Sequence, residues 1–269
     1  MTQDENATQR TQEWQAWQHF WQSPLGRSVV QAEQALLQPW LEKSRGYHLL
    51  WIGGRSAVDA LQASPIRHQM EWRPTLETAD HSACLVADPA YLPLPDESVD
   101  CVLLVHSLEV LERPHALLKE AARVLLSKGE MLIVGFNPWS LWGSLKWMPS
   151  WMQPTQLTLF HQASLLPLNK LDDWLTFVDL QRDECQRGFY RPPCTREKTL
   201  SRLARLDQKF TQRQWPLNGI YVLKVSKRLG CPIQPLRRQQ KTGWMPAQPV
   251  SSATRNLYQA SIKRSANRG

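Results

Sequence analysis

The stretch VDCVLLVHSLEVLERPHALLKEAARVLLSKGEMLIVGF, residues 99–136, contains two predicted strands and the helix between them. Residues 99–105 are almost continuously apolar, which is typical of a strand buried on both faces of a parallel sheet. Pro114 suits the first turn of the helix, and the apolar residues that follow fall on one stripe. Gly129 stands where a C-terminal cap belongs, before a strand over residues 131–136.

The same alternation of strands and helices is expected upstream. Residues 48–52 are predicted to form a first strand that runs into a glycine turn, followed by a short helix that Pro65 ends. Further strands are expected over residues 66–72 and 83–87. We therefore predict an α/β fold: a Rossmann-like open, mostly parallel sheet with helices on both faces.

Three parts of the chain differ in composition. We expect an N-terminal helical segment (residues 1–45), a main domain (46–228) and a basic tail (229–269). The main domain is expected to end with a helix over 171–180 and a strand over 220–225 that pairs with the chain near 188–190. The tail is rich in Pro, Gln, Ser and Arg and lacks apolar periodicity, so we expect it to be flexible.

The N-terminal segment is predicted to contain two helices, separated by the PLG tripeptide at residues 24–26. Trp14, Trp17 and Trp21 recur at spacings of three and four, which places them on one face of the first helix. Such an aromatic stripe more often packs against a neighbouring domain than contacts a ligand. We therefore predict that it packs on the main domain.

The net charge of +8 on 269 residues is concentrated in the tail. Residues 229–269 hold seven basic residues and no acidic one, so the remainder of the chain is nearly neutral. Nucleic-acid binding through these charges is one interpretation, but no aromatic and basic platform accompanies them. A solvated tail is the more common explanation of such a charge pattern.

Several classes of protein are disfavoured by the rest of the composition. No run of eighteen apolar residues predicts a membrane span, and the polar first twenty residues do not resemble a signal peptide. The five cysteines are scattered without a CxxC pair, which favours a cytoplasmic protein over a disulfide framework and predicts no metal site.

One continuous run, VADPAYLPLPDES (residues 86–98) followed directly by the stretch quoted first, carries a resemblance to a known family. It spans residues 86–136 and contains an acidic residue, an LP pair, an SVD triplet and a KG turn in a characteristic order. Together with the glycine turn, it resembles the class I S-adenosylmethionine-dependent methyltransferases, in particular the type 11 family, over residues 48–136. The continuation GFNPWSLWG, residues 135–143, looks like a bacterial branch of that family. The resemblance implies S-adenosylmethionine as cofactor and methyl transfer to an acceptor.

In an open parallel sheet the loops at the carboxyl ends of the strands converge on one crevice. Residues 53–57, 71–73, 88–91 and 106–109 would border it. Within that crevice, the resemblance assigns candidate cofactor-binding residues, which are Gly53, Gly54, Arg55, Glu71, Asp88 and His106.

Each of these residues has an expected role. Gly53 would let the backbone pass close to the adenosyl group, and Asp88 would accept a hydrogen bond from the adenine amino group. Glu71 is the candidate for the ribose hydroxyls, although the register of its strand is hard to predict. His106 would lie near the methionine or the acceptor and is the candidate catalytic base. A turn cap for Asp88 and an ordinary buried histidine for His106 remain open.

The chain departs from the family pattern at four positions. Trp51 stands where the family has an acidic residue, Arg55 and Ala57 replace glycines, and Pro89 removes a backbone N–H that often binds adenine. We expect Arg55 to compensate by binding the methionine carboxylate of the cofactor bidentately. The departures also support an alternative, a catalytically inactive methyltransferase-like binding or scaffold module.

Four tryptophans follow the last predicted parallel strand, at positions 139, 142, 147 and 151. Their indole faces would suit a small aromatic or apolar methyl acceptor, and they would also suit a membrane interface. Burial beneath the following helix is the other interpretation. A peripheral-membrane or quinone-type methyltransferase is therefore the second alternative to a methyltransferase with an unidentified acceptor.

Overall fold

The computed structural model describes residues 15–53, 58–74, 84–147, 157–193 and 217–227. Within them, a seven-stranded sheet has the order β3-β2-β1-β4-β5-β7-β6. Its strands are β1 (His48–Gly53), β2 (His68–Arg73), β3 (Cys84–Val86), β4 (Val99–Val105), β5 (Leu125–Phe136), β6 (Leu180–Gly188) and β7 (Ile220–Lys227). Strands β1 to β5 are parallel, while β7 runs antiparallel to both β5 and β6. The predicted α/β fold is confirmed.

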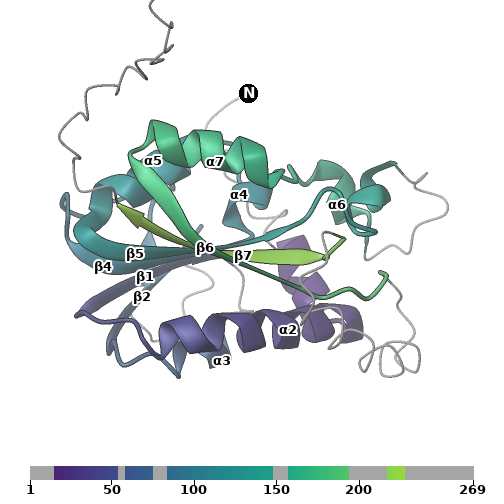
Figure 1. The fold of residues 1–269 in the computed structure, drawn as a ribbon, viewed down its shortest axis with the longest axis horizontal. Coiled ribbons are helices and arrows are strands. Elements are labelled where there is room, and N and C mark those ends of the chain that lie inside the picture. Colours follow the sequence, from purple (N-terminus) through teal and green to yellow (C-terminus); the bar gives the residue numbers. More distant parts are fainter. Residues whose placement is uncertain (1–14, 54–57, 75–83, 148–156, 194–216, 228–269) are drawn as a thin grey trace, which may run out of the picture. The chain divides into compact units, whose positions relative to one another are not determined.

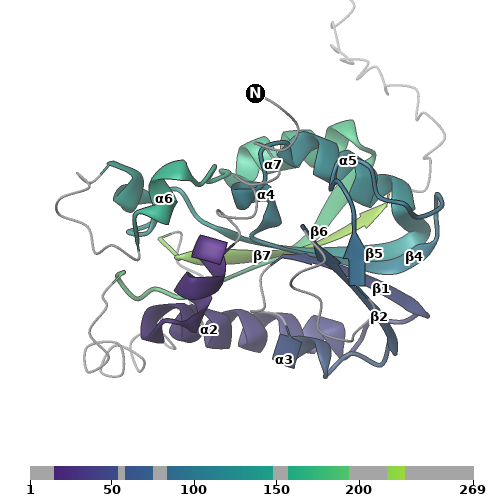
Figure 2. The same ribbon diagram turned by 180° about the vertical axis from the view of Figure 1, so that it is seen from behind.

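Helices cover both faces of this sheet (Figures 1 and 2). They are α2 (Pro24–Leu41), α3 (Val58–Leu61), α4 (Ser107–Val110), α5 (Pro114–Val124), α6 (Leu159–Gln162) and α7 (Leu168–Phe177), with a 3₁₀ helix, η3 (Gly143–Trp147). Helices α5 and α7 pack on one face, and α2 and α3 pack on the other. None of the helices in the described ranges is both long and apolar enough to cross a membrane.

The order of the strands reverses at β1, which pairs with β2 on one side and with β4 on the other. At this switch point Gly53 is aligned with Val105 and has a φ of +146°. A Cβ atom at Gly53 would lie 2.1 Å from the Val105 carbonyl oxygen, so glycine is required here. Ligands of open α/β sheets bind in the crevice outside such a switch point.

The N-terminal helices pack on the sheet as the aromatic stripe predicts. Trp17 and Trp21 are both 5% exposed, and each stacks near Phe136 at the end of β5. Trp14 lies outside the described residues. The break between the two helices is at Ser23, whose side chain accepts a hydrogen bond from Gly26 N–H. Residues 24–26 therefore begin the second helix instead of separating the two, because an N-cap followed by proline is a helix start.

Two other boundaries differ from the predicted ones. Gly129 is part of β5, which begins at Leu125 directly after α5, so it does not cap that helix. Helix α7 ends at Phe177, and Leu180 already belongs to β6. Four consecutive residues of β6 are exposed, so this edge strand lacks the apolar pattern by which a strand is recognised.

The chain divides into two units, Met1–Gly230 and Cys231–Gly269, and all described residues belong to the first. The expected boundaries at residues 45 and 228 stay predictions. The expected flexibility of residues 229–269 concerns a segment outside the described ranges.

Candidate functional site

The carboxyl ends of β1, β2 and β4 bring three elements of the predicted site to one edge of the sheet. Gly53 ends β1, Glu71 lies two residues before the end of β2, and His106 follows β4. Asp88 lies two residues beyond β3 on the same edge. Gly54 and Arg55 lie outside the described residues, so their expected roles stay predictions.

The register of β2 places Glu71 beside Trp51 of β1. An Oε2 atom of Glu71 lies 2.8 Å from Nη2 of Arg73, and both side chains are largely buried. The carboxylate thus has a charged partner on its own strand, and an ionised carboxylate has room for further donors. Its binding to ribose hydroxyls stays a prediction.

Asp88 is exposed and shapes the turn that follows β3. Its Oδ1 atom accepts a hydrogen bond from Ala90 N–H at 2.9 Å, and its carbonyl accepts from Tyr91 N–H at 2.9 Å. This is the turn-capping arrangement that the sequence left open for Asp88. Its proposed contact with adenine stays a prediction, because an Asx turn uses only part of the acceptor capacity of a carboxylate.

His106 is 2% exposed and holds together three parts of the fold. Its Nε2 atom lies 2.7 Å from Oε1 of Glu33 on α2, and its Nδ1 atom lies 2.8 Å from Oε2 of Glu109 on α4. Its backbone has a φ of +53° and its N–H donates to the Val134 carbonyl on β5. Glu109 also accepts from the backbone N–H of Phe136.

Sequence reasoning missed Glu33 and Glu109 as members of this cluster. One signal was available for Glu33: it lies four residues after Val29 and four before Leu37, both on the buried face of α2. A carboxylate in the middle of an apolar helix stripe is rarely buried without a partner. Its partner is 73 residues away along the chain and could not be named from the sequence.

The cluster shows two pKa shifts with different causes. Burial acts to lower the pKa of His106, but the charges of Glu33 and Glu109 outweigh it and raise this pKa to about 9. Burial raises the pKa of Glu109 from its usual value, and the neighbouring imidazole only partly offsets the effect. His106 is therefore an imidazolium at neutral pH, and the cluster is net negative while both carboxylates are ionised.

An imidazolium that donates both N–H groups to carboxylates cannot accept a proton. A base role for His106 would require one of these hydrogen bonds to open first. Trp21 and Phe136 pack against the ring, with centroids at 4.9 Å and 4.3 Å. In the observed geometry His106 fixes the relative positions of α2, α4 and the end of β4.

Some buried polar atoms near these strand ends have no hydrogen-bond partner within the described part of the chain. They are Oε2 of Glu33, Nε1 of Trp51 and Oγ of Ser107. Trp51 lies two residues before the end of β1, and Ser107 two residues after the end of β4. A buried polar group left unpaired costs about 1–3 kcal/mol, so these atoms fit an edge that binds a polar ligand.

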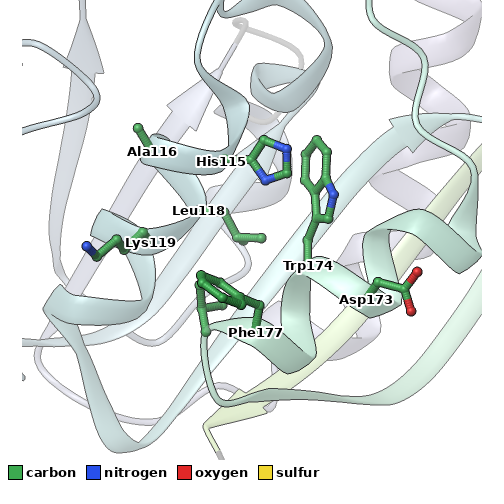
Figure 3. A pocket seen from close by; sticks show the side chains of 8 residues that line it. His115, Ala116, Leu118, Lys119, Asp173, Trp174 and Phe177 are labelled. Carbon is green, nitrogen blue, oxygen red and sulfur yellow. The ribbon is translucent and has the colours of Figure 1, made fainter.

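A hollow of about 610 Å³ lies between α5 and α7 (Figure 3). Its apolar lining includes Leu118, Trp174 and Phe177, and its polar side chains include Lys119 and Asp173. All eight lining residues come from the two helices or the residue after α7. None of these residues belongs to the strand ends at which the cofactor is predicted to bind.

Comparison with known proteins agrees with this architecture. Residues 58–133 match the type 11 family model described as "Methyltransferase domain". A relative from Escherichia coli K12, "Uncharacterized protein YafS", is 35% identical over 158 residues, which cover 59% of this chain and 62% of that protein. The chain thus matches less than two thirds of the length of this relative.

Solved structures with the same fold include two S-adenosylmethionine-dependent methyltransferases. The first, from Thermotoga maritima, is described as a possible histamine N-methyltransferase; it is 17% identical with a TM-score of 0.57, covering 80% of this chain and all of that one. The second, from Archaeoglobus fulgidus, is 17% identical with a TM-score of 0.50, covering 72% and 93%. At these identities the likeness shows the fold alone.

Proposed function

We propose that this chain, in which residues 58–133 match the type 11 methyltransferase family model, is a class I S-adenosylmethionine-dependent methyltransferase of that family and catalyses methyl transfer to an acceptor at the carboxyl ends of β1 and β4. S-adenosylmethionine is the cofactor that the family implies. The observation that carries the proposal is the tight approach of Gly53 to Val105 at the switch point of the sheet. Glycine lets β1 and β4 approach closely at the switch point, outside which ligands of open α/β sheets bind.

The residues present fit the cofactor. Oε2 of Glu33, Nε1 of Trp51 and Oγ of Ser107 supply a buried acceptor, a donor and a hydroxyl without partners in the described ranges. We infer that Glu71 and Asp88 bind the ribose and the adenine, and that Arg55 binds the methionine carboxylate. When bound, the cofactor supplies an already activated methyl group on a sulfonium.

The protein's task is then to position the acceptor and to exclude water. The cluster of Glu33, His106 and Glu109 would form a rigid, net negative wall beside the end of β4, which is electrostatically favourable near a cationic sulfonium. Two observations support rigidity: all three side chains are almost completely buried, and the imidazole donates to both carboxylates.

His106 has two candidate roles, which kinetics can separate. If His106 is the catalytic base, the rate lost in His106→Ala should depend on pH, because only the deprotonated imidazole would be active. A positioning residue predicts a similar loss at every pH together with reduced stability. The buried geometry favours the positioning role, since both ring nitrogens are occupied.

Cofactor binding tests the proposed function without knowledge of the acceptor. S-adenosylmethionine and S-adenosylhomocysteine would each be titrated into the full chain by calorimetry, with melting temperature as a second measurement. A ligand at a hundred times its dissociation constant adds about 2.7 kcal/mol of stability, which is enough to shift the melting temperature. Binding of neither ligand would overturn the proposal in favour of a scaffold module.

Gly53→Ala provides the matched variant. Its new methyl group would meet the Val105 carbonyl, so we expect loss of cofactor binding and lower stability. Gly188→Ala in β6 is the control, because its nearest new contact is the flexible side chain of Leu36 at 2.9 Å. Equal cofactor affinity in both variants would contradict the placement of the cofactor at Gly53.

A further inference from the structure

Four large apolar side chains are exposed near the carboxyl end of β5. Trp139 is 75% exposed, Leu141 56%, Trp147 88% and Leu217 56%. The first three lie in the loop after β5 and in η3, while Leu217 shortly precedes β7. We call these four residues the tryptophan face.

Hydrogen bonds join the two segments that form the tryptophan face. The backbone N–H of Asn137 donates to the Gly219 carbonyl at 2.9 Å, and its side-chain amide donates to Oδ1 of Asn218 at 3.2 Å. Leu217 directly precedes Asn218, and Trp139 follows Asn137 by two residues. The two segments therefore lie side by side at the carboxyl end of β5.

The loop after β5 exposes Trp139 and Trp147 and buries Trp142 between them. Trp142 is 1% exposed, stacks on Phe136 at 5.4 Å, and donates its indole N–H to the Arg191 carbonyl at 2.9 Å. The Ser140 hydroxyl donates to Asn137 O at 2.6 Å and accepts from Trp142 N–H at 3.1 Å. The exposure of Trp139 and Trp147 thus belongs to a defined backbone conformation.

The charges around the tryptophan face are positive. The sequence has no acidic residue between Glu130 and Asp172, and Lys146 directly precedes Trp147. Arg191, whose carbonyl accepts the indole N–H of Trp142, is a second basic residue beside this loop. An anionic partner is therefore electrostatically favoured over a cationic one.

The kinds of side chain distinguish between two anionic partners. A single-stranded nucleic acid stacks its bases on aromatic rings, and the aliphatic Leu141 and Leu217 offer no such platform. A bilayer accepts both kinds, because indoles favour the headgroup level while leucines enter the acyl boundary. Nearby lysine and arginine residues are attracted to anionic lipid headgroups.

We propose that the tryptophan face docks on the surface of an anionic phospholipid bilayer without crossing it. The docking itself does not depend on methyl transfer, because the tryptophan face shares no residue with the cofactor site. β5 ends at the same edge of the sheet as β1 and β4. If the proposed function holds, docking would bring its site close to lipid, which fits an apolar acceptor.

Vesicle flotation of the full chain tests this proposal. The vesicles contain either phosphatidylcholine alone or phosphatidylcholine with phosphatidylglycerol. We expect flotation with the anionic vesicles that weakens as salt is raised. The double variant Trp139→Ala/Trp147→Ala should bind them roughly tenfold or more weakly, since it loses two apolar side chains from the interface.

A second double variant, Tyr47→Ala/Phe177→Ala, is the matched control. These aromatics are 81% and 87% exposed but lie before β1 and at the end of α7, at the opposite edge of the sheet. The basic tail is present in every variant, so its attraction to the vesicles is constant. We expect the control to bind within about twofold of the unchanged protein, and both variants to keep its melting temperature, because exposed side chains add little to stability.

Three results would overturn the proposal. They are failure of the unchanged protein to bind anionic vesicles at low salt, equal binding by the two double variants, and tryptophan-dependent binding of a single-stranded RNA without vesicle binding. The last result would assign the tryptophan face to nucleic acid. Because no measurement here involves the cofactor, the outcome is independent of whether the proposed function survives.

Discussion

The Nε2 atom of His106 lies 2.7 Å from Oε1 of Glu33, so a buried ion pair joins the N-terminal helix α2 to the end of the central strand β4. A second pair at 2.8 Å joins the same imidazole to Glu109. Three titratable groups are therefore packed where the fold has little contact with water. Their charge states must influence both stability and the shape of the candidate site.

Stability is expected to fall as the pH rises from about 6.5 to 9. The pKa of His106 is raised in the folded chain to about 9, so its contribution is complete below its ordinary value of 6.5 and is lost as the pH passes 9. The raised pKa of Glu109 acts in the same direction at lower pH. Between these two pH values the free energy of unfolding is expected to fall by on the order of 3 kcal/mol.

Urea unfolding at a series of pH values would measure this dependence. Tyr221, whose pKa burial raises well above 10, also faces Glu109, but it contributes only at higher pH. Glu33→Gln is the variant to compare, because it removes one of the two charges that raise the pKa of His106. A steeper loss of stability in this variant than in the unchanged protein would contradict the assignment.

Glu33→Ala is expected to destabilise the fold by about 3–5 kcal/mol, the range for removing one partner of a buried ion pair. The imidazolium of His106 would keep a single carboxylate partner in a buried site. Glu42→Ala is the control, since this exposed carboxylate lies at the end of the same helix. Equal unfolding midpoints for the two variants would show that the pair adds no stability.

Trp142→Ala is expected to cost about 3–5 kcal/mol, the range for truncating a buried tryptophan. Its ring contacts Phe136, Phe160 and Phe189, and its indole N–H donates to the carbonyl of the partly buried Arg191. Leu141→Ala alters the adjacent, half-exposed residue and should leave the unfolding free energy nearly unchanged. Chemical denaturation of both variants would decide whether Trp142 anchors the loop.

Arg55→Ala should weaken binding of S-adenosylmethionine by about 1.5–3 kcal/mol, the range for hydrogen bonds to charged groups. The reason is loss of the proposed bidentate contact with the methionine carboxylate. Arg67→Ala serves as the control, because this exposed arginine precedes β2 at the opposite edge of the sheet. Calorimetry that finds the same affinity in both variants would dismiss the contact.

Local sequence patterns predicted most of the sheet. β4 was predicted with its observed limits, because a strand buried on both faces is apolar throughout. β1 begins at its predicted residue and extends one residue beyond its predicted end, to Gly53. β7 begins at its predicted residue, Ile220, and extends two residues further than predicted. β6 was recognised only near its end, since its exposed side chains follow no apolar pattern.

The candidate site was predictable where it depends on chain order. Strand ends converge in any parallel sheet, so Gly53, Glu71, Asp88 and His106 could be assigned to one edge before the structure was known. The partner Glu33 of His106, 73 residues away, was not predictable, whereas the turn cap at Asp88 was one of the two interpretations of that residue. Asp88 binds the neighbouring Ala90 N–H and Glu71 pairs with Arg73, both within two residues, because each side chain meets the nearest complementary group.

The amino-acid sequence by itself determined the succession of elements and the resemblance to a methyltransferase family, since periodicity, turn residues and motif spacing are local properties of the chain. Only the tertiary structure decided that His106 lies between Glu33 and Glu109, and that Trp142 turns inward while Trp139 and Trp147 face solvent. The physical reason is that a side chain's burial, charge state and partners depend on which distant segments pack around it. Those contacts form only when α2, the central strands and the loop after β5 come together.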